Sequence, residues 1–198
     1  MMSKVEDESI FLAISGPSGV GKGTCIAALR RLLPELKLSV SATTRQPRPG
    51  EIDGVHYHFL AKDKFEDYLH NDEIIEYDQF CGSYYGTLKA TLDEAINEHE
   101  DMILDITVKG SLNVKRFFPK QTVTVFIAPP SIECLRARLL GRGTESEEVR
   151  ALRLAQAEAE CKQEDKFDYV VVNKNVDECA QKLLTIFQTV KANLKTKS

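Results

Sequence analysis

Four short apolar runs are spaced along the chain and predict buried β-strands. They are Ile10 to Ser15, Met102 to Ile106, Thr122 to Ala128 and Tyr169 to Val172. The first run, Ile10 to Ser15, is continuously apolar and ends in glycines, which is typical of a buried strand in a parallel sheet. The runs therefore predict the central layer of a domain with helices on each side.

Between these runs, apolar positions recur with the period of an α-helix. The expected helices cover about 21–33, 112–118, 147–164 and 176–194, and a further helix begins after Ser131. Pro34 should end the first helix, and Ser131 should act as the N-cap of the helix that it precedes. Strands that alternate with helices of this length predict an α/β fold with a parallel sheet.

The segment 39–85 departs from this alternation. It is polar, contains turn residues such as Pro47, Pro49 and Gly50, and holds short alternating pieces such as VHYHFL. These pieces predict small antiparallel strands rather than more of the parallel sheet. Because most connections are far shorter, the segment is interpreted as an insertion of roughly fifty residues.

Composition narrows the class of protein. A chain of 198 residues that is 42% hydrophobic is expected to form one globular domain with a sizeable core. Its formal net charge of −4 predicts no general affinity for nucleic acid or anionic membranes, so anions must be bound by local basic clusters. Five cysteines without C-x-x-C spacing, and no apolar segment of membrane-spanning length, favour a cytoplasmic protein with reduced thiols.

The sequence GPSGVGKGT, from Gly16 to Thr24, joins the first predicted strand to the first predicted helix. It departs from the phosphate-loop pattern G-x-x-x-x-G-K-[ST] at Gly23, where a hydroxyl is usual. Such a loop directs backbone N–H groups at an anion, and Lys22 would add a charge for the outer phosphates. Gly23 cannot bind Mg²⁺, so the metal would rely on water, phosphates and a nearby carboxylate. Asp105, near the carboxyl end of its strand, is the best candidate.

Two arginine clusters are further candidates for phosphate binding. Arg45 and Arg48 lie three residues apart in an extended segment and could present planar guanidinium groups to one phosphate. Between residues 131 and 153 every basic residue is an arginine, which is typical of phosphate recognition. These are Arg136, Arg138, Arg142, Arg150 and Arg153. Arg136 and Arg150 are expected to be surface residues paired with Glu133 and Glu147.

Taken together, these motifs resemble those of the guanylate kinase family, whose members transfer a phosphoryl group from ATP to GMP. The resemblance covers about residues 10–184 and includes the phosphate loop, the aspartate strand, the segments IIEY, YYGT and RLLGRGTES, and the pattern S-x-T-T-R-x-P-R-x-G-E-x-x-G-x-x-Y-x-F from Ser41. It implies a three-layer P-loop NTPase core with a parallel sheet, a small mixed α+β insertion that binds GMP, and an arginine-rich lid. The whole chain, 1–198, would be one domain. Its core would comprise 8–40, 92–130 and 154–195, with the insertion at 41–91 and the lid at 131–153.

The same resemblance implies roles for individual residues. ATP would be bound by Asn173 and by the loop residues Gly16, Pro17, Ser18, Gly19, Val20, Gly21, Lys22, Gly23 and Thr24. The GMP phosphate would be held by Arg45, Arg48, Tyr57 and Tyr85, and the guanine by Ser41, Glu76 and Thr87. Asp105 would contribute to GMP binding and would contact the metal only through water. Charge neutralisation during catalysis would be supplied by Lys22, Arg138, Arg142 and Arg153.

The implied cofactor is Mg²⁺ with ATP, and the implied substrates are ATP and GMP. Acceptance of dGMP is also expected, because no residue that recognises the 2′-hydroxyl is evident. No nucleic acid or membrane partner is expected, and the oligomeric state is not fixed. Glu76 explains the choice of base: a carboxylate can accept from guanine N1–H and the N2 amine, whereas adenine presents an acceptor at N1.

Two positions depart from the family pattern. Thr107 replaces the second acid of the aspartate strand, and Lys174 stands where the family often has an acid. One alternative is an inactive member of the family that binds proteins, although the retained Lys22, Arg138 and Arg142 favour an enzyme. Another is a kinase for a different nucleoside monophosphate or for a phosphorylated sugar, against which Glu76 and the YYGT segment argue.

Overall fold

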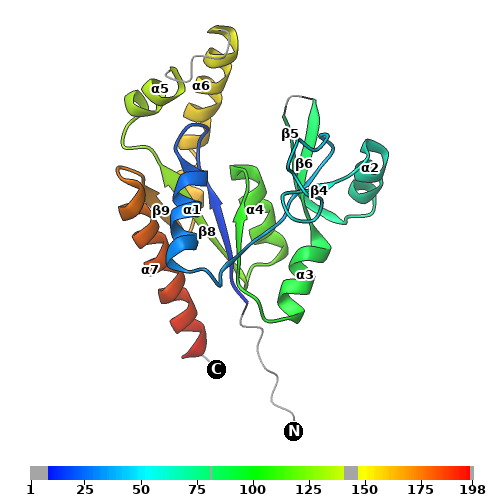
Figure 1. The fold of residues 1–198 in the computed structure, drawn as a ribbon. Helices are drawn as coiled ribbons and strands as arrows, with labels where there is room; N and C mark the ends of the chain where they lie inside the picture. Colours follow the sequence, from blue (N-terminus) through cyan, green and yellow to red (C-terminus); the bar gives the residue numbers. More distant parts are fainter. Residues whose placement is uncertain (1–8, 81, 141–146, 197–198) are drawn as a thin grey trace.

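The computed structural model describes residues 9–80, 82–140 and 147–196, and its centre is a five-stranded sheet in the order β2-β7-β1-β8-β9 (Figure 1). Every neighbouring pair of strands is parallel. The strands are β1 (Phe11–Ser15), β2 (Lys37–Leu38), β7 (Met102–Asp105), β8 (Thr122–Ala128) and β9 (Tyr169–Val172). The predicted α/β fold with a parallel sheet is therefore confirmed.

Alternate residues along β1 show how helices cover both faces of this sheet. Leu12 and Ile14 lie in one buried cluster with residues of α1 (Lys22–Leu32) and α7 (Val176–Lys195). Phe11 and Ala13 lie in a second cluster with residues of α3 (Lys89–Asn97) and α4 (Val108–Phe117). Figure 1 shows α1 and α7 on one side of the sheet and α4 on the other. Burial of a large apolar side chain contributes about 1.5–3 kcal/mol, so these clusters hold the three layers together.

A second, smaller sheet is built from the segment between β2 and α3 and has the order β4-β3-β6-β5. Its strands are β3 (Ala42–Thr43), β4 (His58–Phe59), β5 (Ile74–Phe80) and β6 (Ser83–Leu88). Helix α2 (Lys62–His70) packs on it through the fully buried Phe65, whose ring stacks on Tyr84 with centroids 5.3 Å apart. In Figure 1 this sheet stands beside the core sheet, on the side of α3 and α4.

The strand directions in this second sheet differ in part from the prediction. β6 pairs with β3 and β5 in antiparallel fashion, as expected, but β4, from the VHYHFL segment, runs parallel to β3. The loop 44–57 is long enough to carry the chain back to the start of β3, so the next strand points the same way. Helices α2 and α3 were not predicted either: each has only nine residues, and fully buried positions are few, Phe65 in α2 and Leu92 and Ala95 in α3.

The start of α4 is a second difference. The helix expected over 112–118 begins at Val108, because the Thr107 side chain acts as its N-cap and accepts a hydrogen bond from the Gly110 N–H at 3.1 Å. Gly110 lies in the first turn and weakens the sequence signal for a helix there. Thr107, which stands where the family pattern has a second acid, thus has a structural function as a helix cap.

The remaining helices follow the predicted order. Helix α5 (Ile132–Leu140) begins after Ser131, whose hydroxyl oxygen accepts from the Cys134 N–H at 3.2 Å, as an N-cap does. Helix α6 (Glu147–Cys161) is shorter than expected and is followed by a 3₁₀ turn, η1 (Glu164–Lys166). None of the described helices is long and apolar enough to cross a membrane.

Candidate active site

The loop between β1 and α1 has a backbone that requires glycine. Gly19 and Gly21 have φ angles of 82° and 93°, in the left-handed region that other residues rarely adopt. A Cβ atom on Gly21 would also lie 2.9 Å from Nδ2 of Asn173. The loop residues Gly16 to Thr24 line a cavity of about 440 Å³ at the N-terminus of α1. This is the geometry of an anion-binding site.

Two residues from distant elements hold the loop backbone. The carbonyl oxygen of Val20 accepts from Nδ2 of Asn173 at 2.8 Å and from Nη1 of Arg138 at 3.0 Å. Nη2 of Arg138 also lies 3.4 Å from the backbone oxygen of Asn173. Asn173 is 3% exposed, so its side chain is committed to supporting the phosphate loop. Sequence reasoning placed Asn173 at the ATP site but could not foresee this contact.

Lys22 lies between the phosphate loop and the end of β7. Its Nζ is 2.7 Å from Oδ1 of Asp105 and donates to the carbonyl oxygen of Ile106 at 2.8 Å. Asp105 is opposite Ile14 in the register of β7 with β1, so the sheet itself brings the carboxylate to the loop. Lys22 also lines a second, smaller pocket of about 140 Å³.

This second pocket collects residues from both sheets. It is lined by Ser41, Tyr57, Glu76, Tyr85, Asp105 and Lys22, all of which the sequence analysis selected, and by Asp78, Gly86, Ile106 and Thr107, which it did not assign to the site. Asp78 is two residues after Glu76 on β5, a spacing that puts both side chains on one face of a strand. That spacing is the signal that could have identified it.

Glu76 is the buried acid of this pocket. It is 6% exposed, and its Oε1 accepts a hydrogen bond from the Thr87 hydroxyl at 2.7 Å. Burial raises the pKa of Glu76 above its ordinary value, and the hydrogen bond from Thr87 opposes this in part. The nearby charge of Asp78 raises the pKa further.

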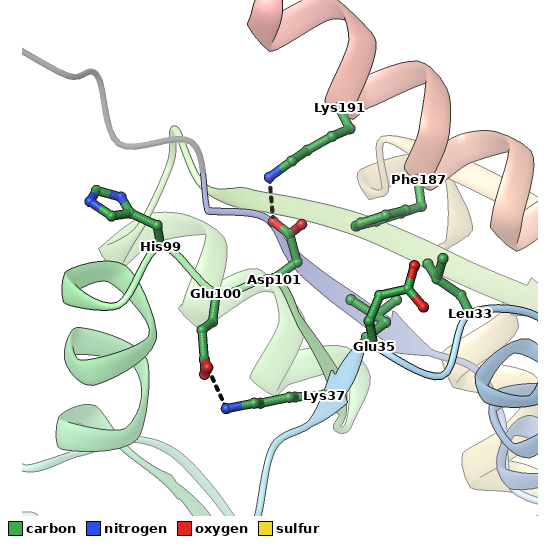
Figure 2. A pocket seen from close by; sticks show the side chains of 9 residues that line it. Leu33, Glu35, Lys37, His99, Glu100, Asp101, Phe187 and Lys191 are labelled. Carbon is green, nitrogen blue, oxygen red and sulfur yellow. Dashed lines mark hydrogen bonds and ion pairs between the residues drawn. The ribbon is translucent and has the colours of Figure 1, made fainter.

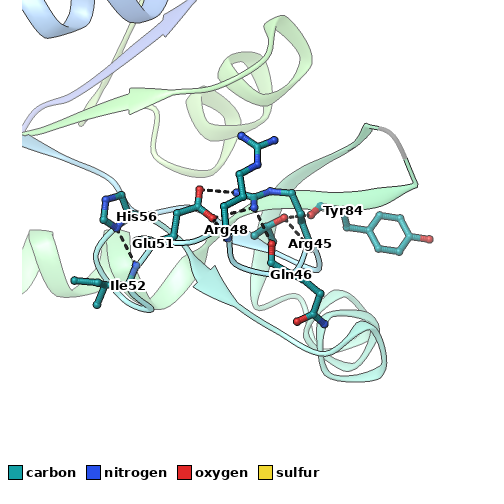
Figure 3. Close-up of polar contacts among 8 residues, drawn as sticks. Arg45, Gln46, Arg48, Glu51, Ile52, His56 and Tyr84 are labelled. Atoms are coloured by element: carbon teal, nitrogen blue, oxygen red, sulfur yellow. Dashed lines mark hydrogen bonds and ion pairs between the residues drawn. The ribbon is translucent and has the colours of Figure 1, made fainter.

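Arg45 and Arg48 are joined through Glu51 (Figure 3). Nη1 and Nη2 of Arg45 each lie 2.9 Å from the Glu51 carboxylate, and the Arg48 N–H donates to the same carboxylate at 2.6 Å. These bonds lower the pKa of Glu51 to about 2. Nη1 of Arg45 also donates to the Gln46 carbonyl oxygen at 2.7 Å, so the terminal fork of this guanidinium is engaged within the protein. The sequence analysis had assumed a free fork.

The segment predicted as the lid, 131–153, includes α5 and the first part of α6, and its arginines have different surroundings. Arg138 holds the phosphate loop as described, Arg153 lies on α6, and Arg142 lies outside the described residues. Nη2 of Arg136 forms an ion pair with Glu158 of α6 at 3.1 Å, because α5 and α6 pack against each other, and the expected partner Glu133 lies near the same positive charge. The side chain of Arg150 lies outside the described part of the chain.

Helix α6 also contacts the phosphate loop. Burial raises the pKa of the Glu160 carboxyl group, and a hydrogen bond from Gln156 and the nearby backbone N–H of Ser18 oppose this in part. The sequence analysis did not select Glu160, because one acid in a helix rich in acids and alanines gives no signal of its own. The contact links the loop to the same helix that carries Arg153.

The donor set fits a magnesium ion that is held mainly by water and phosphate. A Cβ atom on Gly23 would meet nothing within 4 Å, so that position supplies open space. Asp105 is the carboxylate next to the loop, and its side chain is 40% exposed. Within the described ranges, no three His, Cys, Asp or Glu side chains are grouped to hold a metal. Mg²⁺ commonly keeps several waters and binds one or two carboxylates together with substrate phosphates.

Another cavity, of about 310 Å³, lies at the amino ends of the core strands (Figure 2). Lys191 of α7 pairs with Asp101 at 2.9 Å, Asp101 also accepts the Ile10 N–H at 2.8 Å, and Lys37 pairs with Glu100. These bonds join the starts of β1, β2 and β7 to α7. Ligands of open α/β sheets bind at the carboxyl ends of the strands, so we assign this cavity a structural role.

The parallel sheet, the glycine loop and the adjoining pocket with its buried acid define a nucleoside monophosphate kinase of the P-loop class. A family model described as guanylate kinase matches residues 9–190. A guanylate kinase from Desulfitobacterium hafniense is 45% identical over 192 residues, covering 97% of this chain and 96% of that protein. One from Halalkalibacterium halodurans is 42% identical over 181 residues, covering 91% and 88%. The chain belongs to the guanylate kinase family, as the sequence motifs predicted.

A solved structure agrees with this assignment. The crystal structure of guanylate kinase from Anaplasma phagocytophilum superposes on this chain with a TM-score of 0.71 at 29% sequence identity. The superposition covers 94% of this chain and 88% of that one, so it includes both sheets rather than the core alone.

Proposed function

We propose that this chain transfers the γ-phosphoryl group of ATP to GMP and releases ADP and GDP. The observation that carries the proposal is the place of Lys22, which lines both the loop cavity and the pocket that contains Glu76. A donor phosphate on the loop and an acceptor in the second pocket would meet at its ammonium group. Family membership supports the same reaction.

The residues of the second pocket can hold GMP by complementary chemistry. Glu76 would accept from guanine N1–H and the N2 amine, supported by Thr87 and Ser41. The phosphate would bind Tyr57, Tyr85, the guanidinium group of Arg45 and the side chain of Arg48. The acceptor oxygen of GMP is ionised at neutral pH, so no protein base is needed. Catalysis then consists of positioning and neutralisation of charge by Lys22 and the lid arginines.

Mg²⁺ bound with ATP would neutralise charge on the outer phosphates. Asp105 would hold a water ligand of this ion while its Oδ1 orients Lys22.

We also propose that dGMP is accepted, because no role assigned above depends on the 2′-hydroxyl, and that the protein acts in the cytoplasm without nucleic acid or membrane partners. The residue boundaries of the core, insertion and lid given above belong to the same proposal.

Asp105→Asn is expected to lower magnesium-dependent turnover by about 10- to 100-fold, as loss of a group that orients metal-bound water commonly does. The amide keeps the shape of the side chain but removes the charge next to Lys22. Turnover should be measured over a range of Mg²⁺ concentrations at saturating ATP and GMP. If Asp105→Asn keeps the full magnesium-dependent turnover of the parent protein, the role proposed for Asp105 is wrong.

Acidification is expected to reduce kcat/KM for GMP, because Glu76 must be ionised to accept from guanine. The pKa of Glu76 is raised, so this loss should begin at a pH above the ordinary range of a glutamate. Glu51, with a pKa of about 2, stays ionised over that range and keeps Arg45 in place. The GMP phosphate also titrates, so the pH profile of Glu76→Gln serves as the reference. Identical profiles for the two proteins would contradict the assignment.

The reaction is tested by product analysis. The protein is incubated with ATP, Mg²⁺ and one of GMP, dGMP, AMP or UMP, and the nucleotides are separated by anion exchange. We expect equal amounts of ADP and GDP with GMP, and ADP with dGDP when dGMP is supplied. Products from AMP but not from GMP would overturn the choice of acceptor. No product with any acceptor would favour the inactive, protein-binding alternative.

A further inference from the structure

The Glu76 carboxylate has two different surroundings. Its Oε1 accepts from Thr87 at 2.7 Å, whereas no hydrogen bond to its Oε2 is found among the described residues. Oε2 instead lies against the first turn of α4, which packs on β5, the strand that carries Glu76. The orientation of the carboxylate therefore depends on the residue of α4 at this position.

Helix α4 presents Gly110. A Cβ atom at this position would lie 2.5 Å from Oε2, 2.8 Å from Cδ and 3.2 Å from Cγ of Glu76. Three successive atoms of the glutamate therefore lie along the bare Cα of Gly110. A methyl group could not be accommodated by rotating the carboxylate alone, because Cδ and Cγ would still be too close. The whole buried side chain would have to move, and its hydrogen bond from Thr87 would be strained or lost.

The first turn of α4 is fixed at both of its ends. Thr107 caps it by accepting from the Gly110 N–H at 3.1 Å. Ser15, the last residue of β1, donates through Oγ to the Thr107 carbonyl oxygen at 2.8 Å and lies 2.6 Å from Oγ of Ser111. Gly16 of the phosphate loop follows Ser15 directly, so one short network connects the loop, the helix cap and the surface that supports Glu76.

We infer that Gly110 is a positioning residue for guanine recognition: the space left by its missing side chain, fixed by the Thr107 cap, sets the carboxylate of Glu76 so that it accepts from both donors of the base. The inference rests on the proposed role of Glu76. It also gives Thr107 a function in the acceptor site that does not require an acid.

The test uses Gly110→Ala and compares GMP with IMP, which has the N1–H of guanine but lacks the N2 amine. Dissociation constants of GMP, IMP and ATP are measured by titration calorimetry, and kcat/KM for both acceptors by a coupled assay. Gly110→Ala should weaken the binding of GMP by about tenfold or more. It should also lower the ratio of kcat/KM for GMP to kcat/KM for IMP, since a displaced carboxylate loses its second hydrogen bond to the base. Binding of ATP should be unchanged. Arg116→Ala, an exposed change on the same helix, is the control and should keep all values.

A purely structural role would not change the GMP to IMP ratio. Alanine favours a helix more than glycine does, so α4 itself is not weakened by the substitution. If Gly110→Ala binds GMP within about twofold of the parent protein and keeps the ratio, the inference is wrong. If this variant does not fold, Thr107→Ala and Thr107→Ser decide: the ratio should fall in the first and recover in the second, and equal ratios would overturn the inference. Failure of the unaltered protein to bind GMP would instead reject the proposed function.

Discussion

Lys22→Ala is expected to lower kcat for phosphoryl transfer by about 10²- to 10³-fold, the loss typical of removing one group that stabilises developing charge. Lys22 lies at the junction of the two cavities, within 2.7 Å of Asp105. Its ammonium group can therefore follow the phosphoryl group from donor to acceptor. The fold should be unaffected, because the Asp105 carboxylate left behind is 40% exposed and remains hydrated. Both kcat and the melting temperature should be measured.

Lys37→Ala is the matched control for Lys22→Ala. The substitution likewise removes an ion pair with an acid, Glu100, but this pair lies at the amino ends of the strands, away from the two cavities that Lys22 lines. We expect Lys37→Ala to keep the kcat of the parent protein. A Lys22→Ala protein with kcat within about threefold of the parent would show that charge neutralisation is supplied elsewhere in the site.

Glu76→Gln is expected to reduce kcat/KM for GMP by about 5- to 150-fold, which corresponds to the roughly 1–3 kcal/mol carried by a bidentate contact to a base. The amide of glutamine keeps one acceptor oxygen, but its NH₂ group is a donor and would face N1–H or the N2 amine of guanine, which are donors too. The side chain is 6% exposed, so water cannot relieve this mismatch. The kcat/KM for AMP should not fall in parallel, so the ratio of kcat/KM for GMP to kcat/KM for AMP should decrease. The test therefore measures kcat/KM for both acceptors.

Glu66→Gln provides the comparison for this second variant. Glu66 lies on α2, and its side chain is 44% exposed and pairs with Lys62. The same chemical change at that position should leave both kcat/KM values intact. If Glu76→Gln lowers activity with GMP and AMP equally, Glu76 supports the fold of the pocket and does not choose the base.

The core of the fold could be predicted because its signals are local. β1 is a continuous apolar run, and the phosphate loop follows it directly, so one segment of sequence specifies strand, loop and helix together. The short strands of the second sheet were harder to predict. β3 and β4 have two residues each, and their relative direction depends on the path of a fourteen-residue loop, 44–57, that carries no periodic pattern.

Local motifs selected Arg45 and Asp105, and the resemblance to guanylate kinases selected Glu76; the fold brings Glu76 and Asp105 to one pocket. Contacts made between distant segments could not be predicted. Nothing near Val20 indicates that Asn173, 153 residues away, donates to its carbonyl oxygen. Likewise, the engagement of Arg45 by Glu51 and the close approach of Gly110 to Glu76 depend on side-chain positions that only the assembled fold defines.

The most direct test of the account is the ratio of kcat/KM for GMP to kcat/KM for AMP in the unaltered protein, with ATP and Mg²⁺ held at saturation. A pocket with a buried carboxylate next to a phosphate loop predicts that GMP is preferred by about 100-fold or more. Comparable values for the two acceptors, or a preference for AMP, would contradict the account.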